Sequence, residues 1–91
     1  MPRIPSVAAA HIGAKIAATR KERGLTQDQL AVLSDIDSSN IRSYESGRAM
    51  LSILTLVRIA EALKTPPGEF IDDLGSDMFS PAPHAAQRRA G

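Results

Sequence analysis

The 91-residue sequence contains no cysteine and no tryptophan, and aromatic residues make up only 3% of it. Without cysteine the chain cannot form a disulfide framework, a cysteine-based zinc site or a thiol nucleophile. A core with so few aromatic groups must be built from Leu, Ile, Val and Ala, which suits packed helices better than strands. The length fits one domain and is too short for a deep catalytic cleft between lobes. The composition therefore favours a small all-α domain.

Long apolar runs are also absent, since no stretch approaches the ~18 consecutive apolar residues of a membrane-spanning helix. The first ten residues, MPRIPSVAAA, carry one arginine and a short run of small residues, which is too weak for a signal peptide. We therefore expect a cytoplasmic protein without a membrane partner.

The net charge of only +1 does not by itself identify a partner, because a nucleic-acid-binding domain is usually strongly basic. The charges are unevenly distributed, however. Residues 1–58 carry a net charge of +3 and residues 59–91 one of −2. Such a polarised chain can turn one face toward a polyanion, although ordinary solvated charges would give the same counts.

The most informative stretch is TQDQLAVLSDIDSSNIRSYESG, residues 26–47, which predicts two short helices joined by a tight turn. Thr26 and Gln29 form a capping box before the apolar face of Leu30, Ala31 and Leu33. Asp37 is the next N-cap candidate, so the residues between must turn sharply.

The two helices are expected at about 27–34 and 38–45. In the second, Ile41 and Tyr44 mark the buried side. The remaining side chains are polar and can bond a base edge or a phosphate, as is typical of a helix that reads DNA. These expected base-reading residues are Ser38, Ser39, Asn40, Arg42 and Ser43.

Helices are also predicted on either side of this pair. Ser6 can cap a helix that ends at Gly24, and Ser52 can cap ILTLVRIAEAL, in which apolar residues from Ile53 onward recur at helical spacing. The prolines at 66 and 67 stop this helix and start a fifth one with an apolar side. The predicted organisation is an arm at 1–6, a domain at 7–75 and a mobile tail at 76–91.

Three motifs resemble those of the phage repressor and Cro type of helix-turn-helix protein, also called the xenobiotic-response-element family. They are GLTQDQLA at 24–31, NIRSYESG at 40–47 and SILTLVRIAEAL at 52–63. The resemblance covers about residues 12–74 and implies a five-helix DNA-binding domain. Asp35 stands where the family favours glycine, and it tolerates the left-handed conformation better than most residues.

The resemblance also implies roles for single residues. Gln27 would contact a backbone phosphate at a helix N-terminus, and Arg48 is assigned to a phosphate as well. Arg42 would read a guanine, because its fork matches O6 and N7 together, or it would only neutralise a phosphate. Arg20 and Glu45 match a family pair that joins the first and third helices, with two independent surface charges as the alternative.

The implied function is a sequence-specific transcriptional regulator, associated with the nucleoid, that binds a near-palindromic operator in double-stranded DNA as a homodimer. The expected dimer surface consists of Phe70, Ile71, Leu74, Met78 and Phe79. One alternative is the antitoxin of a toxin–antitoxin pair or the controller of a restriction system. Another is a helical protein-interaction module that does not bind DNA.

Catalysis is not expected. The two histidines, His11 and His84, have no second ligand or nucleophile at a useful spacing, and the glycines form no phosphate loop. The sequence implies no metal or cofactor.

Overall fold

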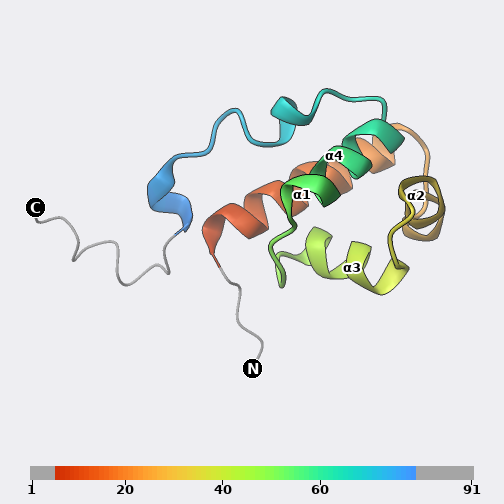
Figure 1. Cartoon of the computed structure of the whole chain (residues 1–91), viewed down its shortest axis with the longest axis horizontal. Coiled ribbons are helices and arrows are strands. Elements are labelled where there is room, and N and C mark those ends of the chain that lie inside the picture. Colours follow the sequence, from red (N-terminus) through yellow and green to blue (C-terminus); the bar gives the residue numbers. More distant parts are fainter. Residues whose placement is uncertain (1–5, 80–91) are drawn as a thin grey trace, which may run out of the picture.

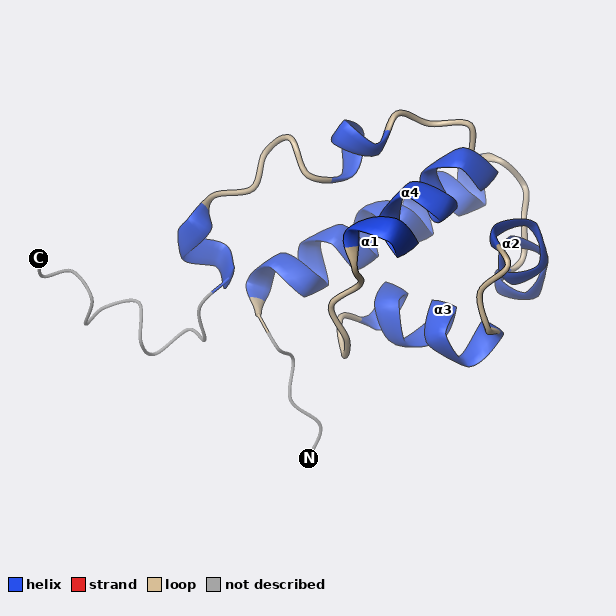
Figure 2. Ribbon diagram, in the orientation of Figure 1, coloured by secondary structure: helices blue, strands red, loops and turns tan. Residues whose placement is uncertain are grey.

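The computed structural model describes residues 6–79, which form four α-helices and two short 3-10 turns. Figure 2 shows that this part of the chain contains helices and loops but no strand. The elements are α1 (Val7–Glu22), α2 (Gln27–Ser34), α3 (Ser38–Ser46), α4 (Ile53–Ala62), η1 (Pro67–Phe70) and η2 (Ser76–Phe79). None of these helices is long and apolar enough to span a bilayer.

The prediction of an all-α fold is confirmed, but the prediction of a fifth α-helix is wrong, because the segment after α4 makes only the single turn η1. Two prolines supply no backbone N–H at its start, and the glycine that follows is a poor helix former. The folded chain continues through η2, so residues 76–79 of the predicted tail have a defined structure. Residues 1–5 of the predicted arm and 80–91 of the tail lie outside the described residues.

The helices pack in a chain of contacts around one core, with α1 against α3, α3 against α2, and α2 against α4 (Figure 1). After α4 the chain returns along α1, so that both η1 and η2 lie against that first helix. The largest fully buried side chains come from five of the six elements or their caps. They are Ile16, Leu30, Ile41, Ile59, Leu63 and Phe70.

Local sequence signals set the helix starts. Ser6 accepts a hydrogen bond from the Ala9 amide, and Thr26 and Gln29 form both bonds of a capping box. Asp35 ends α2 with φ of 59°, the left-handed conformation that the turn requires. The helix pair is therefore joined as its local sequence indicates.

Two apolar residues that were expected in the core lie outside it. Leu33 is 58% exposed, because Ser34 occupies the buried position and its hydroxyl donates to the Leu30 carbonyl at 2.7 Å. Ile53 is also exposed, since it begins α4 one turn before the first buried residue of that helix, Leu56. The two predictions failed for the same reason. The spacing of apolar residues indicates a helix, but it does not fix the edges of the buried face to within one residue.

The segment between η1 and η2 is tied to α1 by charged groups. Lys15 Nζ donates to Asp73 Oδ1 at 3.0 Å and to the Glu69 carbonyl at 3.2 Å, and His11 Nε2 lies 2.9 Å from Asp73 Oδ1. The hydrogen bonds from Lys15 and then His11 lower the pKa of Asp73, and the bond to Asp73 raises the pKa of Lys15. These contacts hold the C-terminal segment beside α1.

The packing of α1 on α3 depends on two glycines. A Cβ atom on Gly13 would overlap the carbonyl oxygens of Tyr44 and Glu45. Gly47 ends α3 with φ of 81°, and a Cβ there would lie 2.8 Å from Ala10 Cα. Backbone therefore meets backbone where the two helices cross.

We predict that Gly13→Ala lowers the free energy of unfolding by about 1–3 kcal/mol, because the carbonyl oxygens it meets belong to a helix and cannot move aside. Urea unfolding followed by circular dichroism measures the loss. Gly68→Ala is the matched control, since nothing lies within 4 Å of its added Cβ. An unchanged stability for Gly13→Ala would contradict the close approach of α1 and α3.

Candidate nucleic-acid interface

The second helix of the pair, α3, turns its polar residues away from the core. Ile41 is fully buried and Tyr44 is half-buried, so these two residues define the inner side of the helix. Of the five residues expected to read bases, three are exposed and two are half-buried. The exposed ones are Ser39, Asn40 and Arg42, and the half-buried ones are Ser38 and Ser43.

The start of α3 differs in detail from the prediction. Asp37 occupies the N-cap position, but its side chain makes no capping hydrogen bond. Its carboxylate instead accepts from the Ser39 hydroxyl at 3.1 Å. Asp37 therefore has the predicted N-cap position but not the predicted capping hydrogen bond. The sequence position of an Asp does not show whether its carboxylate accepts from a backbone amide or from a nearby hydroxyl.

Arg20 of α1 and Glu45 of α3 form a bidentate ion pair. Arg20 Nε donates to Glu45 Oε2 at 2.7 Å, and a second guanidinium nitrogen lies 3.1 Å from Oε1. The two side chains are only 11% and 5% exposed. Arg20 also donates to the Leu25 carbonyl at 2.8 Å, in the loop before α2. One guanidinium therefore joins α1, α3 and the approach to α2.

Gln27 belongs to the same network, a contact that the sequence did not predict. Its side-chain nitrogen donates to Glu45 Oε1 at 2.9 Å, so the first residue of α2 is bonded to α3. A carboxamide nitrogen has two hydrogens, which leaves one donor for another acceptor. Since 18 residues separate Gln27 from Glu45, no periodicity in the sequence could have paired them.

The two remaining arginines of this region are loosely held. Arg42 lies 3.7 Å from an Asp28 oxygen, and both side chains are more than half exposed. Such a solvated pair contributes little, so Arg42 can exchange Asp28 for another acceptor. Arg48 is exposed in the loop directly after Gly47, where its backbone amide donates to the Ser43 carbonyl at 3.0 Å. Both guanidinium groups therefore remain accessible, that of Arg42 in the middle of α3 and that of Arg48 just beyond its C-terminal end.

The helices α2 and α3 form a pair in which α3 is fixed on its inner side by a buried ion pair and is polar on its outer side. This arrangement can be compared with known protein families. The model of the helix-turn-helix family matches residues 16–70 of the chain. The chain belongs to the helix-turn-helix family. The resemblance of its three motifs to repressor and Cro-type helix-turn-helix DNA-binding proteins is thereby confirmed.

Relatives of this helix-turn-helix protein include the uncharacterized HTH-type transcriptional regulator y4dJ of Sinorhizobium fredii. The two sequences are 35% identical over 75% of this chain and 88% of that protein.

Two solved structures share the fold. The restriction-modification controller protein C.AhdI from Aeromonas hydrophila is 31% identical, with a TM-score of 0.67 over 68% of this chain and 94% of that one. The biofilm master regulator SinR, solved in complex with DNA, is 27% identical, with a TM-score of 0.65 over 67% of this chain and 98% of that one.

We predict that Glu45→Ala lowers the free energy of unfolding by about 3–5 kcal/mol, because it leaves the Arg20 charge buried without its partner. Asp28→Ala is the control, since it removes an exposed carboxylate from a solvated pair and should cost less than about 1 kcal/mol. Urea unfolding of both variants tests the difference. A loss below about 1 kcal/mol for Glu45→Ala would rule out a stabilising buried bridge.

Proposed function

We propose that this helix-turn-helix protein is a sequence-specific transcriptional regulator that inserts α3 into the major groove of double-stranded DNA. The supporting observation is that α3 presents polar side chains on its exposed side while a buried ion pair fixes its inner side to α1. Arg42 supplies the longest donor for a guanine, and Ser38, Ser39, Asn40 and Ser43 supply short polar groups.

Phosphate contacts would position this helix on the duplex. The second donor of Gln27 lies at the N-terminus of α2, where backbone amides and the helix dipole favour an anion. Arg48 extends the same function to the far end of α3. Because Gln27 is also bonded to Glu45, a phosphate held by Gln27 would position α3 directly.

A homodimer is part of the proposal, since a helix as short as α3 meets too few base pairs to be selective. Two copies that read half-sites about 34 Å apart would supply the missing affinity and would match a near-palindromic operator. The dimer requires a self-complementary surface away from α3.

The prediction that Phe70 lies on that surface is wrong, because its side chain is 1% exposed and completes the core of its own chain. Ile71 and Phe79 remain exposed, and Leu74 and Met78 are half-buried. Ile71, Leu74 and Phe79 line an apolar groove of about 460 Å³, together with residues at the start of α4. Met78 does not line this groove.

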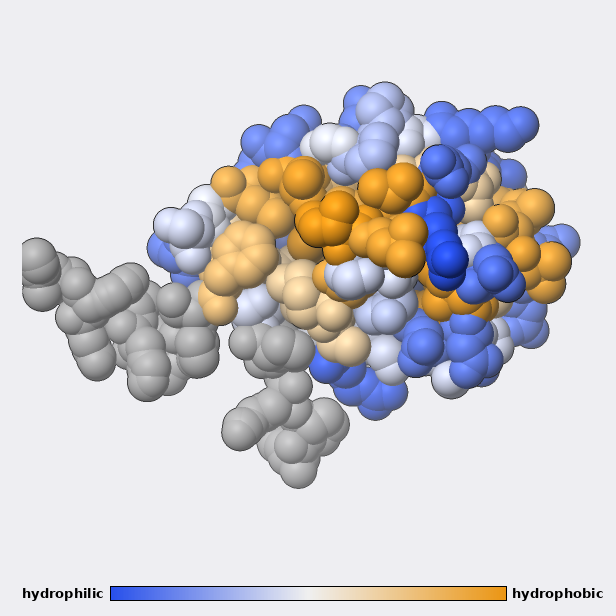
Figure 3. Space-filling view, in the orientation of Figure 1, coloured by the Kyte–Doolittle hydropathy of each residue, from blue (hydrophilic) through white to orange (hydrophobic). Residues whose placement is uncertain are grey.

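The residues from the α4 side of the groove include Met50 and Ile53, which are both exposed. Figure 3 shows an apolar surface that extends across this face toward the C-terminal segment. We assign the dimer surface to this apolar groove.

The DNA proposal is tested by selecting bound duplexes from a random pool. We expect an inverted repeat, and affinity that falls steeply with salt as counterions are released. Arg42→Ala should relax the preference at one position by about 1–3 kcal/mol, whereas Gln27→Ala should weaken all sequences alike. If no motif is recovered and no salt-dependent binding is found, the chain is a protein-interaction module.

The dimer is tested by light scattering and sedimentation at micromolar concentration. We expect a dimer, and we expect Ile53→Ser or Phe79→Ser to shift the protein to monomer. The helical content should not change, because both side chains are exposed in the single chain and do not support its fold. Val32→Ser is the matched control, since it removes an apolar group of α2 that is even more exposed than Ile53 or Phe79. A wild-type protein that stays monomeric with and without DNA would contradict the assignment.

A controller of a restriction system is the second candidate within this proposal, because C.AhdI is a restriction-modification controller protein and nearly all of its chain matches this fold. An antitoxin is the remaining alternative, in which the tail from Ser76 would fold on a toxin. Residues 76–79 of that tail form η2, and residues 80–91 lie outside the described residues. A toxin that co-purifies with the full chain would distinguish the antitoxin from both.

A further inference from the structure

The outer side of α2 carries an apolar strip whose two most exposed residues lie outside the core. Val32 is 81% exposed and Leu33 is 58% exposed, whereas Leu30 and Ala31 on the inner side are buried. Leu25, from the preceding loop, lies beside Val32 and Leu33 and is half-buried, because part of its side chain packs against the core. We call Val32, Leu33 and Leu25 the α2 strip. Adjacent bulky apolar groups with this exposure indicate an interaction surface.

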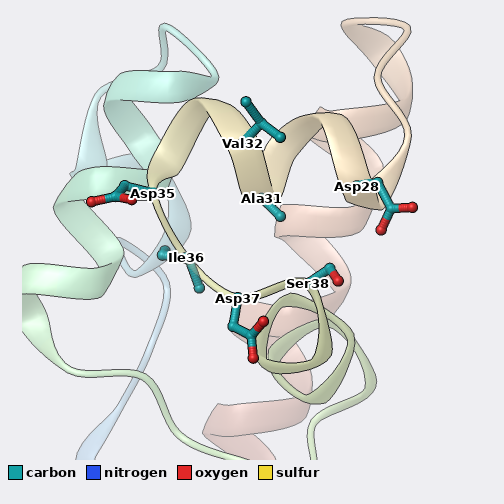
Figure 4. A pocket seen from close by; sticks show the side chains of 7 residues that line it. All are labelled: Asp28, Ala31, Val32, Asp35, Ile36, Asp37 and Ser38. Atoms are coloured by element: carbon teal, nitrogen blue, oxygen red, sulfur yellow. The ribbon is translucent and has the colours of Figure 1, made fainter.

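Two hollows lie beside Val32. One, of about 630 Å³, extends from α2 to the start of α3 and includes Asp28, Asp35 and Asp37 in its lining. Figure 4 shows Val32 directed away from the core at the top of α2, with Asp28 and Asp35 at opposite ends of that helix and Asp37 below. The other hollow, of about 430 Å³, is mainly apolar and lies between Val32 and Leu25. Val32 therefore projects between two places that a partner's side chains can fill.

The charge around the strip selects the kind of partner. No lysine or arginine lines either hollow, and the two together include three aspartates. On the far side of Leu33, α4 contributes charges of both signs, Arg58 and Lys64 beside Glu61. The face around Val32 is therefore apolar with an acidic border.

A second copy of the chain does not fit the α2 strip, because a two-fold contact would bring the same three carboxylates against one another. A basic partner would instead cover the apolar groups and neutralise the border. An amphipathic helix does both, since it presents apolar side chains at a spacing of three or four residues with charged groups beside them.

We propose that the α2 strip is the docking site of a basic amphipathic helix from a protein partner. Apolar side chains of that helix cover Val32 and Leu33, and its lysines or arginines meet Asp28, Asp35 and Asp37. The site is distinct from the apolar groove of the proposed dimer. Asp28 lies beside Arg42 of α3, so a partner bound here would be next to the bound duplex.

The probe for this site is a synthetic helical peptide with leucines on one face and lysines beside them, added to the isotope-labelled full chain. We expect saturating shifts of the amide signals of α2, and weaker binding at high salt. Val32→Ser should weaken the peptide about tenfold through the lost apolar contact, and Asp35→Asn should weaken it severalfold. Neither residue is buried, so both variants should fold as the wild type does.

Two controls test the specificity of this interaction. A peptide with glutamates in place of the lysines should not bind, and Ile53→Ser, in the apolar groove, should leave the affinity unchanged. The proposal is overturned if the lysine peptide does not bind at millimolar concentration or if the glutamate peptide binds equally well. It is also overturned if the shifts centre on the apolar groove. The titration contains no DNA, so its result does not depend on the proposed function of α3.

Discussion

The buried contact between Arg20 and Glu45 is the interaction on which the geometry of the helix pair depends. Glu45 accepts from Arg20 of α1 and from Gln27 of α2, so one carboxylate determines how α3 lies against two other helices. Burial makes each bond directional and makes any unpaired member costly. Exposed pairs such as Arg42 and Asp28 impose no such geometry. The molecule therefore combines a rigid inner side of α3 with side chains on the outer side that remain free to adapt.

The close approach of backbones at Gly13 and Gly47 works together with this ion pair. Because Gly13 and Gly47 have no side chains, α1 can approach α3 closely. Arg20 can then donate to Glu45 with two of its guanidinium nitrogens. The same network brings Gln27 to the edge of α3. In the proposed complex with DNA, a phosphate held near Gln27 and the bases near Arg42 would thus be placed by one set of contacts. Stability and the proposed recognition share the same residues for this reason.

The described surface is divided into faces of different chemistry. The outer side of α3 is polar with accessible arginines, the apolar groove lies between the start of α4 and the C-terminal segment, and the α2 strip is apolar with an acidic border. Each of these surfaces favours a different class of partner. Carboxylates repel phosphates, and exposed bulky apolar groups are stabilised when another apolar surface covers them. The three proposed partners, which are DNA, a second copy and a basic protein, would therefore bind separate surfaces of this small domain.

Features that depend on neighbours within a few residues could be predicted from the sequence alone. These are the capped starts of α1, α2 and α4, the left-handed turn at Asp35, and a motif specific enough to imply both the family and the pairing of Arg20 with Glu45. The packing of the helices, in contrast, was needed to show that Leu33 and Ile53 face solvent, that Phe70 closes the core, and that Gln27 donates to Glu45. Caps and turns are local hydrogen bonds that a short stretch can specify. Burial and long-range bonds depend instead on how whole helices meet, which no periodicity within one helix records.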